Sequence, residues 1–344
     1  MQEVKEKQCD SVSIVIPMYN EEKFIVSLVD SILKQDYDFK YIELIFIDGN
    51  STDNTIKKLQ KCLKNSNVKY RILKNPKRIT PMSVNIGIRN AKNDIIIRLD
   101  AHSEYPNNYV SKCVYYLNKT GADNVGCLFL ATSKNKIGAA IADVVSSKFG
   151  VGNSQFRING ESGYVDTVPY GTFRKTLVDK IGYFNEELIR SEDNEFNYRI
   201  IKNGGKVYMF NDIGIYYYPR DTIPKIMKMG YDNGKWSVYT NYFIPGSMKL
   251  RHFIPLLFVI SLIGGISFWI LNINIIKYMF WLELFLYLGL DIISSFKSAK
   301  KGIIHVFLMF IIYPLFHISY GLGSLAGIGK IIKKKTFKVS VILW

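Results

Sequence analysis

A carboxylate and an imidazole stand directly behind an apolar run in the stretch IIIRLDAHSEYP, residues 95–106. The isoleucines predict a buried strand, because β-branched side chains pack well on a pleated surface. Asp100 follows the run, and His102 comes two residues later. A strand requires neither side chain. We therefore expect both to serve a ligand at the end of the strand.

Strand and helix patterns alternate through the first hundred residues. Strands are predicted over 11–17, 41–48, 68–73 and 93–100, and helices over 20–35, from Ser51 onward and around 82–91. This alternation indicates an α/β fold with a parallel sheet. Ligands of such sheets bind beyond the carboxyl ends of the strands. Tyr19, Asp48 and Asp100 fall at or just after such ends, which predicts that they face one ligand crevice.

The class of ligand is narrowed by motifs that the sequence lacks and by the acids that it has. No G-x-G-x-x-G follows the first strand and no G-x-x-x-x-G-K-[S/T] occurs, so neither a dinucleotide fold nor a P-loop is expected. Carboxylates favour Mg²⁺ or Mn²⁺ bound together with substrate phosphates, and an imidazole ligand suits Mn²⁺ better. Plainer roles stay open: Asp48 and Asp53 could cap a helix, and His102 could bond to backbone.

The character of the chain changes near residue 250. Three apolar stretches follow, at 253–271, 275–293 and 303–325. The first carries no charge and is long enough to cross a hydrocarbon core of ~30 Å, whereas the other two could be re-entrant or interfacial. We expect a cytoplasmic catalytic domain over 1–220, interfacial linker helices over 221–250 and a transmembrane region of two or three segments over 251–344.

Charge bears on the partners of the chain. Its net charge of +16 is shared evenly between the parts before and after residue 250, and the basic tail at 329–338 is what an anionic cytoplasmic leaflet attracts. Three full spans would put that tail outside, against the positive-inside tendency, whereas two spans and a re-entrant segment would not.

Nucleic acid is not an expected partner, because no groove-reading motif occurs. The cysteines show neither metal-ligand pairing nor a disulfide pattern, which fits a reducing cytoplasm; they are Cys9, Cys62, Cys113 and Cys127.

Several motifs in a fixed order resemble glycosyltransferase family 2. They are IVIPMYNEE, FIDGNSTDNT, RLDAHSEYP, YVDTVPYGTFRK, EELIRSEDNEFNYRI and GYDNGKW, and they cover about residues 11–236. The DAH triplet, the VDTVPYGTFR stretch and the apolar C-terminal region look most like the succinoglycan-type exopolysaccharide glycosyltransferases. The resemblance implies a GT-A (Rossmann-like) fold, a nucleotide-sugar donor, a divalent metal (Mn²⁺ or Mg²⁺) and inversion at the anomeric carbon.

The resemblance also implies a role for individual residues on the donor side. The residues expected to bind the nucleotide sugar are Pro17, Tyr19, Glu21, Asp48, Asp53, Arg78 and Asp100. Of these, Asp48 would hydrogen-bond the base, Asp53 would support its loop, and Arg78 would lie near the uracil or the phosphates. Asp100 and His102 take the first and last positions of the family's D-x-D motif, as metal ligands. The imidazole is a departure from that motif and puts the choice of metal in question.

On the acceptor side, Asp193 matches the family's general base, and Glu192 lies beside it. The local sequence alone would favour a solvated acidic turn here, and only the order of the motifs argues for catalysis. Lys235 and Trp236 stand where processive synthases carry Q-x-x-R-W, and are expected on the acceptor or diphosphate side. Asp232 replaces the glutamine of that motif and Lys235 its arginine, which weakens the case for processive synthesis.

The resemblance leads to one main functional hypothesis and two alternatives. The main one is transfer of a sugar, with UDP the expected nucleotide, to a polyprenyl-diphosphate-linked glycan at the cytoplasmic face of a bacterial plasma membrane, for extracellular polysaccharide. Membrane lipids would be partners. One alternative is a processive synthase whose membrane segments form a channel. The other is a non-enzymatic membrane scaffold that retains the fold.

Overall fold

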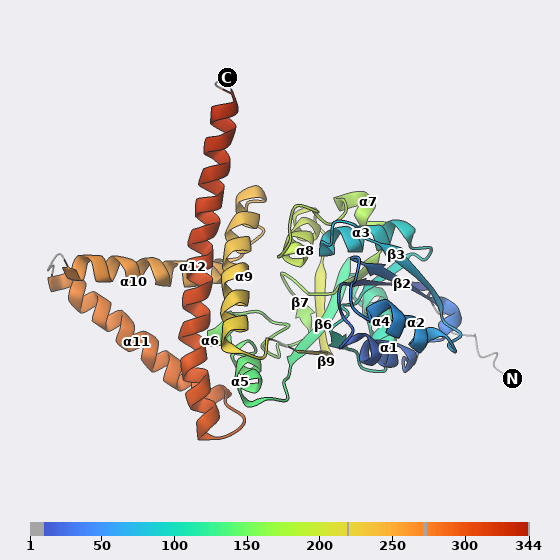
Figure 1. Cartoon of the computed structure of the whole chain (residues 1–344), viewed down its shortest axis with the longest axis horizontal. Helices are drawn as coiled ribbons and strands as arrows, with labels where there is room; N and C mark the ends of the chain where they lie inside the picture. The colour runs from blue at the N-terminus through green and yellow to red at the C-terminus, as the bar shows by residue number, and fades with distance from the viewer. Residues whose placement is uncertain (1–9, 219, 271–273, 343–344) are drawn as a thin grey trace. The chain divides into compact units, whose positions relative to one another are not determined.

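The computed structural model describes residues 10–218, 220–270 and 274–342, and within them leaves out the side chains at 268–270 and 334–342. Cys9 and the last residue of the apolar stretch predicted at 253–271 lie outside the described residues. The chain divides into two compact units (Figure 1). The first runs to Leu128 and resumes over Glu161–Tyr216, and the second combines Phe129–Gly160 with the chain from Tyr217 onward. The functional boundaries predicted at 220 and 250 stay predictions.

A parallel sheet forms the first half of the first unit. Strand β1 (Val12–Met18) pairs with both β2 (Ile42–Asp48) and β4 (Ile95–Arg98), and β2 pairs with β3 (Lys69–Lys74), all in parallel. Every residue of β2 and β4 is buried, as expected for strands covered on both faces. The four strands predicted from the sequence are confirmed, and Asp48 and Asp100 stand at the carboxyl ends of two of them.

Helices cover both faces of this sheet. Figure 1 shows α3 (Thr80–Asn90) on one face and α1 (Ile25–Leu33), α2 (Thr55–Leu63) and α4 (Tyr109–Thr120) on the other. Gly87 lets α3 approach β1, because a Cβ at this position would overlap the side chain of Val15. A short 3₁₀ turn, Phe39–Tyr41, precedes β2. Helix α2 begins later than predicted: its N-cap is Asn54 rather than Ser51 or Asp53.

The second half of the sheet is antiparallel, so the sheet is mixed rather than wholly parallel. Strand β8 (Thr172–Arg174) lies between β4 and β6 (Asn124–Ala131) and is antiparallel to both. The remaining strands of the described residues are β5 (Ser103–Glu104), β7 (Gly163–Tyr164) and β9 (Val207–Tyr217), with helices α7 (Leu177–Ile181) and α8 (Glu192–Lys202) between them. Because β8 runs against β4, the residues just before β8 lie beside the carboxyl end of β4.

The second unit consists mainly of helices. They are α5 (Lys136–Val144), α6 (Lys148–Val151), α9 (Ile223–Phe243), α10 (Ile254–Ile270), α11 (Asn274–Ser298) and α12 (Ile303–Ile342), with a 3₁₀ turn at Leu250–His252. Helix α5 packs on α12 through an apolar cluster that includes Ile141, Val144, Ile312 and Tyr313. Within the described residues, α11 and the 303–333 part of α12 are long and apolar enough to cross a membrane, and α10 is shorter. These helices indicate membrane association.

Helices α9 and α12 approach each other closely at glycines. Gly230 and Gly234 lie four residues apart on α9, and Gly323 and Gly327 do so on α12. A Cβ at Gly234 would overlap the carbonyl oxygen of Tyr320, and one at Gly323 would overlap that of Tyr231. Small residues at this spacing let two helix backbones pack directly.

We predict that Gly234→Ala destabilises the protein although alanine is the better helix former. The added methyl group must push α9 from α12, and overpacking of this kind costs about 1–3 kcal/mol. Gly329→Ala on α12 is the matched control, since a Cβ there meets no atom within 4 Å. Thermal unfolding in detergent should show a lower midpoint for Gly234→Ala and an equal or higher one for Gly329→Ala. Equal midpoints for the two variants would contradict the packing.

Candidate active site

A pocket opens beyond the carboxyl ends of β1 and β4 in the first unit. Its lining residues are Pro17, Met18, Tyr19, Glu21, Gly49, Arg78, Ile79, Thr80, Ser83, Arg98, Leu99, Asp100 and His102. Of the residues singled out from the sequence, the pocket brings together Pro17, Tyr19, Glu21, Arg78, Asp100 and His102. The crevice predicted from strand ends is therefore present with Tyr19 and Asp100 on its wall, whereas Asp48 is not among its lining residues.

One nitrogen of the His102 imidazole contacts two carboxylates. Its Nδ1 is 3.1 Å from Oδ1 of Asp100 and 3.4 Å from Oε1 of Glu21. The Asp100 carboxylate raises the pKa of His102 well above its ordinary value, against the effect of burial. Burial alone would raise the pKa of Asp100, but His102 and the Tyr170 hydroxyl, which donates to Oδ2 at 2.7 Å, hold it well below its usual range.

A divalent cation fits these donors only as part of a larger set. Among the described residues, no group of three His, Cys, Asp or Glu side chains is arranged to hold a metal ion. Asp100 and His102 offer one carboxylate and one imidazole at the pocket wall. Mg²⁺-type sites with one or two protein ligands are completed by substrate phosphates and water. The donor set thus fits a cation that binds together with a nucleotide diphosphate.

Loops around the pocket hold strained backbone conformations. Among the described residues, the non-glycine positions with left-handed φ are Asn20, Asn50, Arg78, Asn159, Tyr170 and Ser191. Asn20 and Asn50 flank pocket residues, and Arg78 is one of them; Tyr170 contacts Asp100. Backbone strain of this kind costs about 1–3 kcal/mol per residue and concentrates at functional sites. The guanidinium of Arg78 lies 5.2 Å from the ring centroid of Tyr19, which joins two sides of the pocket.

Asp48 and Asp53 hold the loop after β2. Asp48 is buried and accepts hydrogen bonds from the backbone nitrogen and hydroxyl of Ser51, the latter at 2.6 Å. Asp53 accepts from the Thr55 hydroxyl at 2.5 Å and from the backbone nitrogen of Glu22 at 3.2 Å. These bonds tie the loop after β2 to the loop after β1. The nucleotide-binding roles predicted for both aspartates stay predictions.

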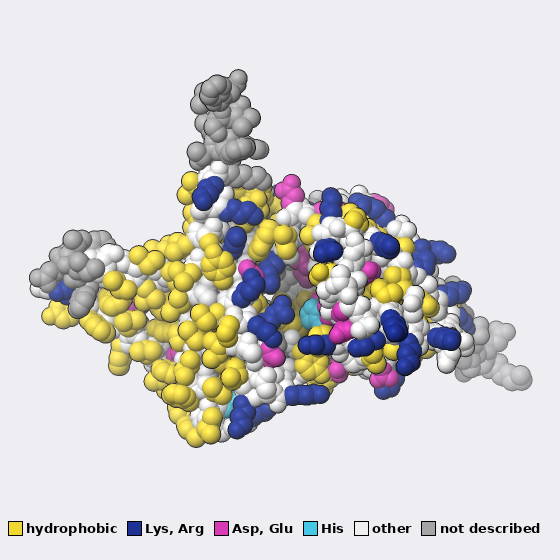
Figure 2. Space-filling view, viewed as in Figure 1, with side chains coloured by type: hydrophobic (Ala, Val, Ile, Leu, Met, Phe, Trp, Pro, Cys, Tyr) yellow, Lys and Arg dark blue, Asp and Glu magenta, His cyan; other side chains and the backbone are white. Residues whose placement is uncertain are grey.

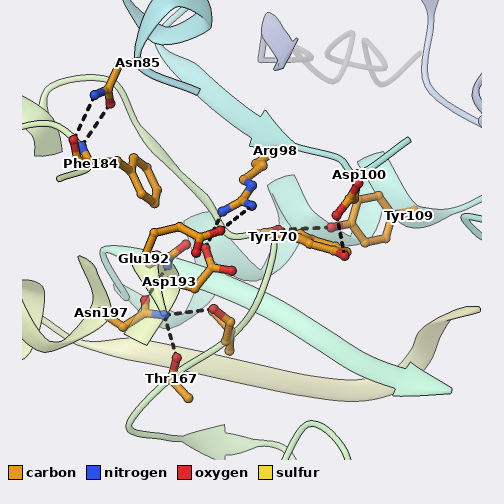
Figure 3. A network of polar contacts seen from close by, with 12 residues as sticks. Asn85, Arg98, Asp100, Tyr109, Thr167, Tyr170, Phe184, Glu192, Asp193 and Asn197 are labelled. Atoms are coloured by element: carbon orange, nitrogen blue, oxygen red, sulfur yellow. Dashed lines mark hydrogen bonds and ion pairs between the residues drawn. The ribbon is translucent and has the colours of Figure 1, made fainter. Parts of the chain in front are cut away.

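The predicted base is paired with a buried arginine that the sequence analysis did not single out (Figure 3). Nη1 of Arg98 is 2.5 Å from Oδ1 of Asp193, and Nη2 is 3.1 Å from Oε1 of Glu192. The Arg98 side chain is 3% exposed and lies near the rings of Tyr170 and Phe184. Arg98 and Asp100 are two residues apart and line the same pocket, so the arginine joins the predicted base to the predicted metal ligands.

Burial and neighbouring charges shape the pKa of Asp193. Removal from water raises it and Arg98 lowers it, while Glu192 and Asp100 raise it further, to about 7. A carboxylate with a pKa near the working pH is well matched to general base catalysis, because it is ionised yet basic enough to accept a proton. Asp193 and Glu192 lie in the first turn of α8, where the helix dipole favours negative charge.

Helix α8 is anchored by buried polar side chains. Asn197 donates to the Thr167 hydroxyl at 2.9 Å and accepts from Asn124 at 2.7 Å (Figure 3). Glu195, one turn before Arg199, pairs with it at 2.5 Å, and Arg199 also donates to the carbonyl groups at 181–183. These contacts fix the start of α8 and hence the position of Asp193.

One signal in the sequence could have identified Arg98. An arginine inside an otherwise apolar strand must find a buried acid, because a buried unpaired charge is very costly. No comparable signal marks Tyr170, whose contact with Asp100 spans 70 positions in the chain.

The predicted acceptor residues Lys235 and Trp236 lie in the second unit, on α9. The ring of Trp236 packs against Tyr239 at a centroid distance of 5.4 Å, and Nζ of Lys330 lies 4.8 Å from the Trp236 ring and 4.2 Å from the Tyr239 ring. Their acceptor role stays a prediction.

Comparison with solved structures defines the class of protein. The fold resembles a mannosyltransferase from Pyrobaculum calidifontis in complex with GDP-Man and Mn²⁺, with a TM-score of 0.59 at 16% identity over 93% of this chain and 88% of that one. It also resembles residues 1–349 of TarS from Staphylococcus aureus, with a TM-score of 0.51 at 17% identity over 92% and 90% of the two chains. The chain thus has the GT-A-like fold of nucleotide-sugar glycosyltransferases.

Sequence comparison then identifies the family. Residues 13–181 match the model for glycosyl transferase family 2. A dolichyl N-acetyl-α-D-glucosaminyl phosphate 3-β-D-2,3-diacetamido-2,3-dideoxy-β-D-glucuronosyltransferase from Methanococcus voltae is 33% identical over 63% of this chain and 70% of its own length. The succinoglycan biosynthesis protein ExoA from Rhizobium meliloti is 29% identical over 71% and 74%. The chain belongs to glycosyl transferase family 2 and is a glycosyltransferase, as the motifs predicted.

We predict that Arg98→Lys strongly lowers the rate of sugar transfer, although the substitution keeps the positive charge. Lysine keeps the positive charge but cannot donate to Asp193 and Glu192 in the fixed fork of a guanidinium. Arg174→Lys is the control, because Arg174 makes a comparable pair with Asp94 on the surface. Sugar-transfer kinetics should show a lower kcat for Arg98→Lys, with the KM for donor little changed, and wild-type values for Arg174→Lys. A wild-type kcat in Arg98→Lys would rule out a positioning role.

Proposed function

We propose that the protein is an inverting glycosyltransferase that moves a sugar from a nucleotide-sugar donor, with UDP as the nucleotide, to a lipid-linked oligosaccharide acceptor. The reaction takes place at the cytoplasmic face of a membrane and serves the synthesis of extracellular or capsular polysaccharide. The observation that carries the proposal is the Asp193–Arg98–Asp100 arrangement, in which a base and a metal ligand flank one arginine.

Asp193 is the general base. The acceptor hydroxyl attacks the anomeric carbon of the donor sugar while its proton passes to the Asp193 carboxylate. A new C–O bond forms, the bond from the anomeric carbon to the phosphate oxygen breaks, and the nucleoside diphosphate leaves with the bonding electrons. Arg98 holds the carboxylate in place by a charge-assisted hydrogen bond. Glu192 pairs with the same Arg98 guanidinium. The arginine therefore stabilises the Asp193 anion less than it would alone, and the Asp193 carboxylate stays basic.

Asp100 and His102 would hold a divalent cation, Mn²⁺ or Mg²⁺, together with the bound donor. As a Lewis acid, that cation would stabilise the negative charge that develops on the leaving diphosphate. The Tyr170 hydroxyl orients the Asp100 carboxylate, and Glu21 contacts the same Nδ1 of His102 as Asp100 does. Mn²⁺ is the better match to a site that contains an imidazole.

The nucleotide occupies the pocket between the loops after β1 and β2. Tyr19 and Arg78 contact the base or the phosphates, and the buried Asp48 recognises the base. Pro17 and Glu21 form the wall of the pocket, and Asp53 keeps the two loops together through its bond to the backbone of Glu22. UDP is the nucleotide named with a solved TarS structure, although the match to that chain supports the fold alone.

The acceptor is a polyprenyl-diphosphate-linked glycan. The relative from Methanococcus voltae is named for a dolichyl-phosphate-linked sugar and ExoA for succinoglycan biosynthesis, which supports a lipid-linked acceptor and a polysaccharide product. Lys235 and Trp236, in a helix that packs on an apolar one, suit the diphosphate and lipid end of such an acceptor. Membrane lipids are then natural partners of the chain.

We predict that one nucleotide sugar in a panel of UDP- and GDP-sugars supports metal-dependent turnover by the detergent-solubilised protein. Release of nucleoside diphosphate is measured with Mn²⁺, with Mg²⁺ and with EDTA, in the presence of a bacterial lipid extract as acceptor. Asp193→Asn should lower kcat by about 10²–10⁴-fold and leave donor affinity largely intact, because the amide cannot accept the proton.

The matched control is Asp179→Asn, the same change at an exposed position on α7, which should keep the wild-type rate. A rate for Asp193→Asn above half of wild type would sink the assignment of the base. Turnover that is unaffected by EDTA would show that the reaction does not need the metal, and it would not contradict the assignment of Asp193 as the base. Chain length of the product separates single addition from processive synthesis.

We predict that activity falls on acidification through about pH 7. The pKa of Asp193 is raised to about 7, so below that pH the carboxylate carries a proton and cannot serve as a base. Glu192→Gln should move this acid limb to lower pH, because the Glu192 charge raises the pKa of Asp193. Profiles of log(kcat/KM) against pH for wild type and Glu192→Gln test this, because kcat/KM reports the pKa values of the free enzyme. A limb that stays in place, or moves to higher pH, would show that another group titrates.

A further inference from the structure

Helix α12, the longest of the described helices, is contacted at two distant points by α5 and α9. These two helices begin at neighbouring points. Residues 132–135 connect β6 to α5, and residues 218–222 connect β9 to α9. The backbone nitrogen of Thr132 donates to the carbonyl oxygen of Tyr217 at 3.0 Å. Helices α5 and α9 therefore start from neighbouring points, and short connections keep both on the same side of any membrane.

The start of α12 is held by α5 through buried polar contacts. Nε2 of His305 is 2.8 Å from Oδ2 of Asp143, and Nζ of Lys300, in the turn before α12, is 3.1 Å from Oδ1 of the same carboxylate. The Tyr313 hydroxyl donates to Oγ of Ser147 at 2.8 Å. His305, Asp143 and Ser147 are all less than a tenth exposed. The turn between α11 and α12 therefore lies on the same side of the membrane as α5.

The other end of α12 is held by α9. The Ser237 and Tyr320 hydroxyls are 2.8 Å apart, and a Cβ at Gly327 would overlap the backbone of Lys235. Helix α9 does not suit hydrocarbon, because Lys225, Lys228, Asp232 and Lys235 recur every three or four residues along it, and charges at membrane depth are costly. Helix α11 differs, because its acids are hydrogen-bonded between and within the helices, Glu283 to the Ser261 hydroxyl and Asp291 to that of Ser295. The Lys228 side chain is 77% exposed. The end of α12 near Gly327 is therefore fixed to the same side as its start.

These two attachments exclude a crossing by α12. An α-helix rises about 1.5 Å per residue, so His305 and Gly327 are about 33 Å apart along α12. This distance is similar to the ~30 Å thickness of a hydrocarbon core. A crossing helix would carry α5 and α9 to opposite sides of the bilayer, which the connections before them do not allow. We propose that α12 lies flat in the membrane interface and that the α10–α11 hairpin is the part that enters the bilayer and returns.

The hairpin has the surface that such an insertion requires. Only Asp291 and Ser295 of α11 are buried, and its exposed apolar residues cover one broad face of the helix; they include Ile275, Tyr278, Met279, Trp281, Leu282, Phe285, Leu286, Ile293 and Phe296. Figure 2 shows the apolar side chains of α10 and α11 as one continuous surface, and Figure 1 shows the two helices extending to one side of α12 and converging away from it. Helix α10 starts against α12, where Gly321 admits Pro255 and Val259. An apolar face this broad and this exposed fits lipid chains.

This arrangement also accounts for the basic end of α12. Lys330 and Lys333 stay on the side of α5 and α9, as the positive-inside tendency requires of a cytoplasmic catalytic unit. Flat-lying helices with lysines on the polar side bind anionic interfaces. Neither the apolar stretch at 303–325 nor the helix built from it then counts as a span.

The test is the accessibility of single thiols in sealed membrane vesicles of known orientation. In the full chain with Cys9→Ser and Cys62→Ser, one cysteine is placed at Lys134→Cys, Lys301→Cys or Lys333→Cys, all exposed positions. Cys113 and Cys127 are buried and stay. A membrane-impermeant maleimide should label all three variants in vesicles of one orientation and none in the other. Labelling after detergent shows that each thiol can react.

Two results would overturn the proposal. Lys301→Cys on the opposite face from Lys134→Cys would mean that the α10–α11 hairpin does not return, and Lys333→Cys on the opposite face from Lys301→Cys would mean that α12 crosses. A second measurement tests the hairpin itself. Leu282→Glu with Phe285→Glu should move the protein from the membrane pellet to the alkaline-carbonate supernatant, whereas Tyr115→Glu, at an exposed aromatic of α4, should not. Retention of the double variant in the pellet would place the anchor elsewhere.

Discussion

The buried guanidinium of Arg98 is the interaction on which the rest of the site depends. A cation that is 3% exposed requires partners, and it takes them from the first turn of α8, 94 and 95 positions further along the chain. Arg98 ends β4 and Asp100 stands two residues beyond it, and both line the same pocket. One short stretch of sequence thus positions the proposed base through its arginine and supplies a proposed metal ligand in its aspartate.

Acids outnumber bases among the charged groups that pair at the site before any substrate binds. Asp100 and Glu21 both contact His102, and Asp193 and Glu192 both contact Arg98. Tyr170 joins the two groups, since its hydroxyl bonds Asp100 and its ring lies near the Arg98 guanidinium. A nucleotide diphosphate would add further negative charge to this set. In the proposed reaction it would therefore favour a divalent cation that binds with it.

A different constraint governs the helical unit: its charged side chains and its closely packed backbones must lie where they do not contact lipid chains. Asp143 from the middle of the sequence binds the turn before α12, and the lysine-rich α9 packs on α12 through opposed glycines. An apolar helix that is covered along one face by charged helices has only its other face left for lipid. The α10–α11 hairpin has no such cover, and this difference separates an interfacial helix from an inserted pair.

The sequence by itself determined the parallel strands and their helices, the acids at the strand ends and the apolar C-terminal region, because hydrophobic periodicity and strand-end chemistry are local. It also contained the motifs that place the chain in its family. Only the tertiary structure decided the antiparallel β8 that brings Tyr170 to Asp100, the partners of Arg98, and the membership of Phe129–Gly160 in the helical unit. These features join residues 70 to 162 positions apart. Such contacts form when distant segments bury one another, and no local period in a sequence records that choice.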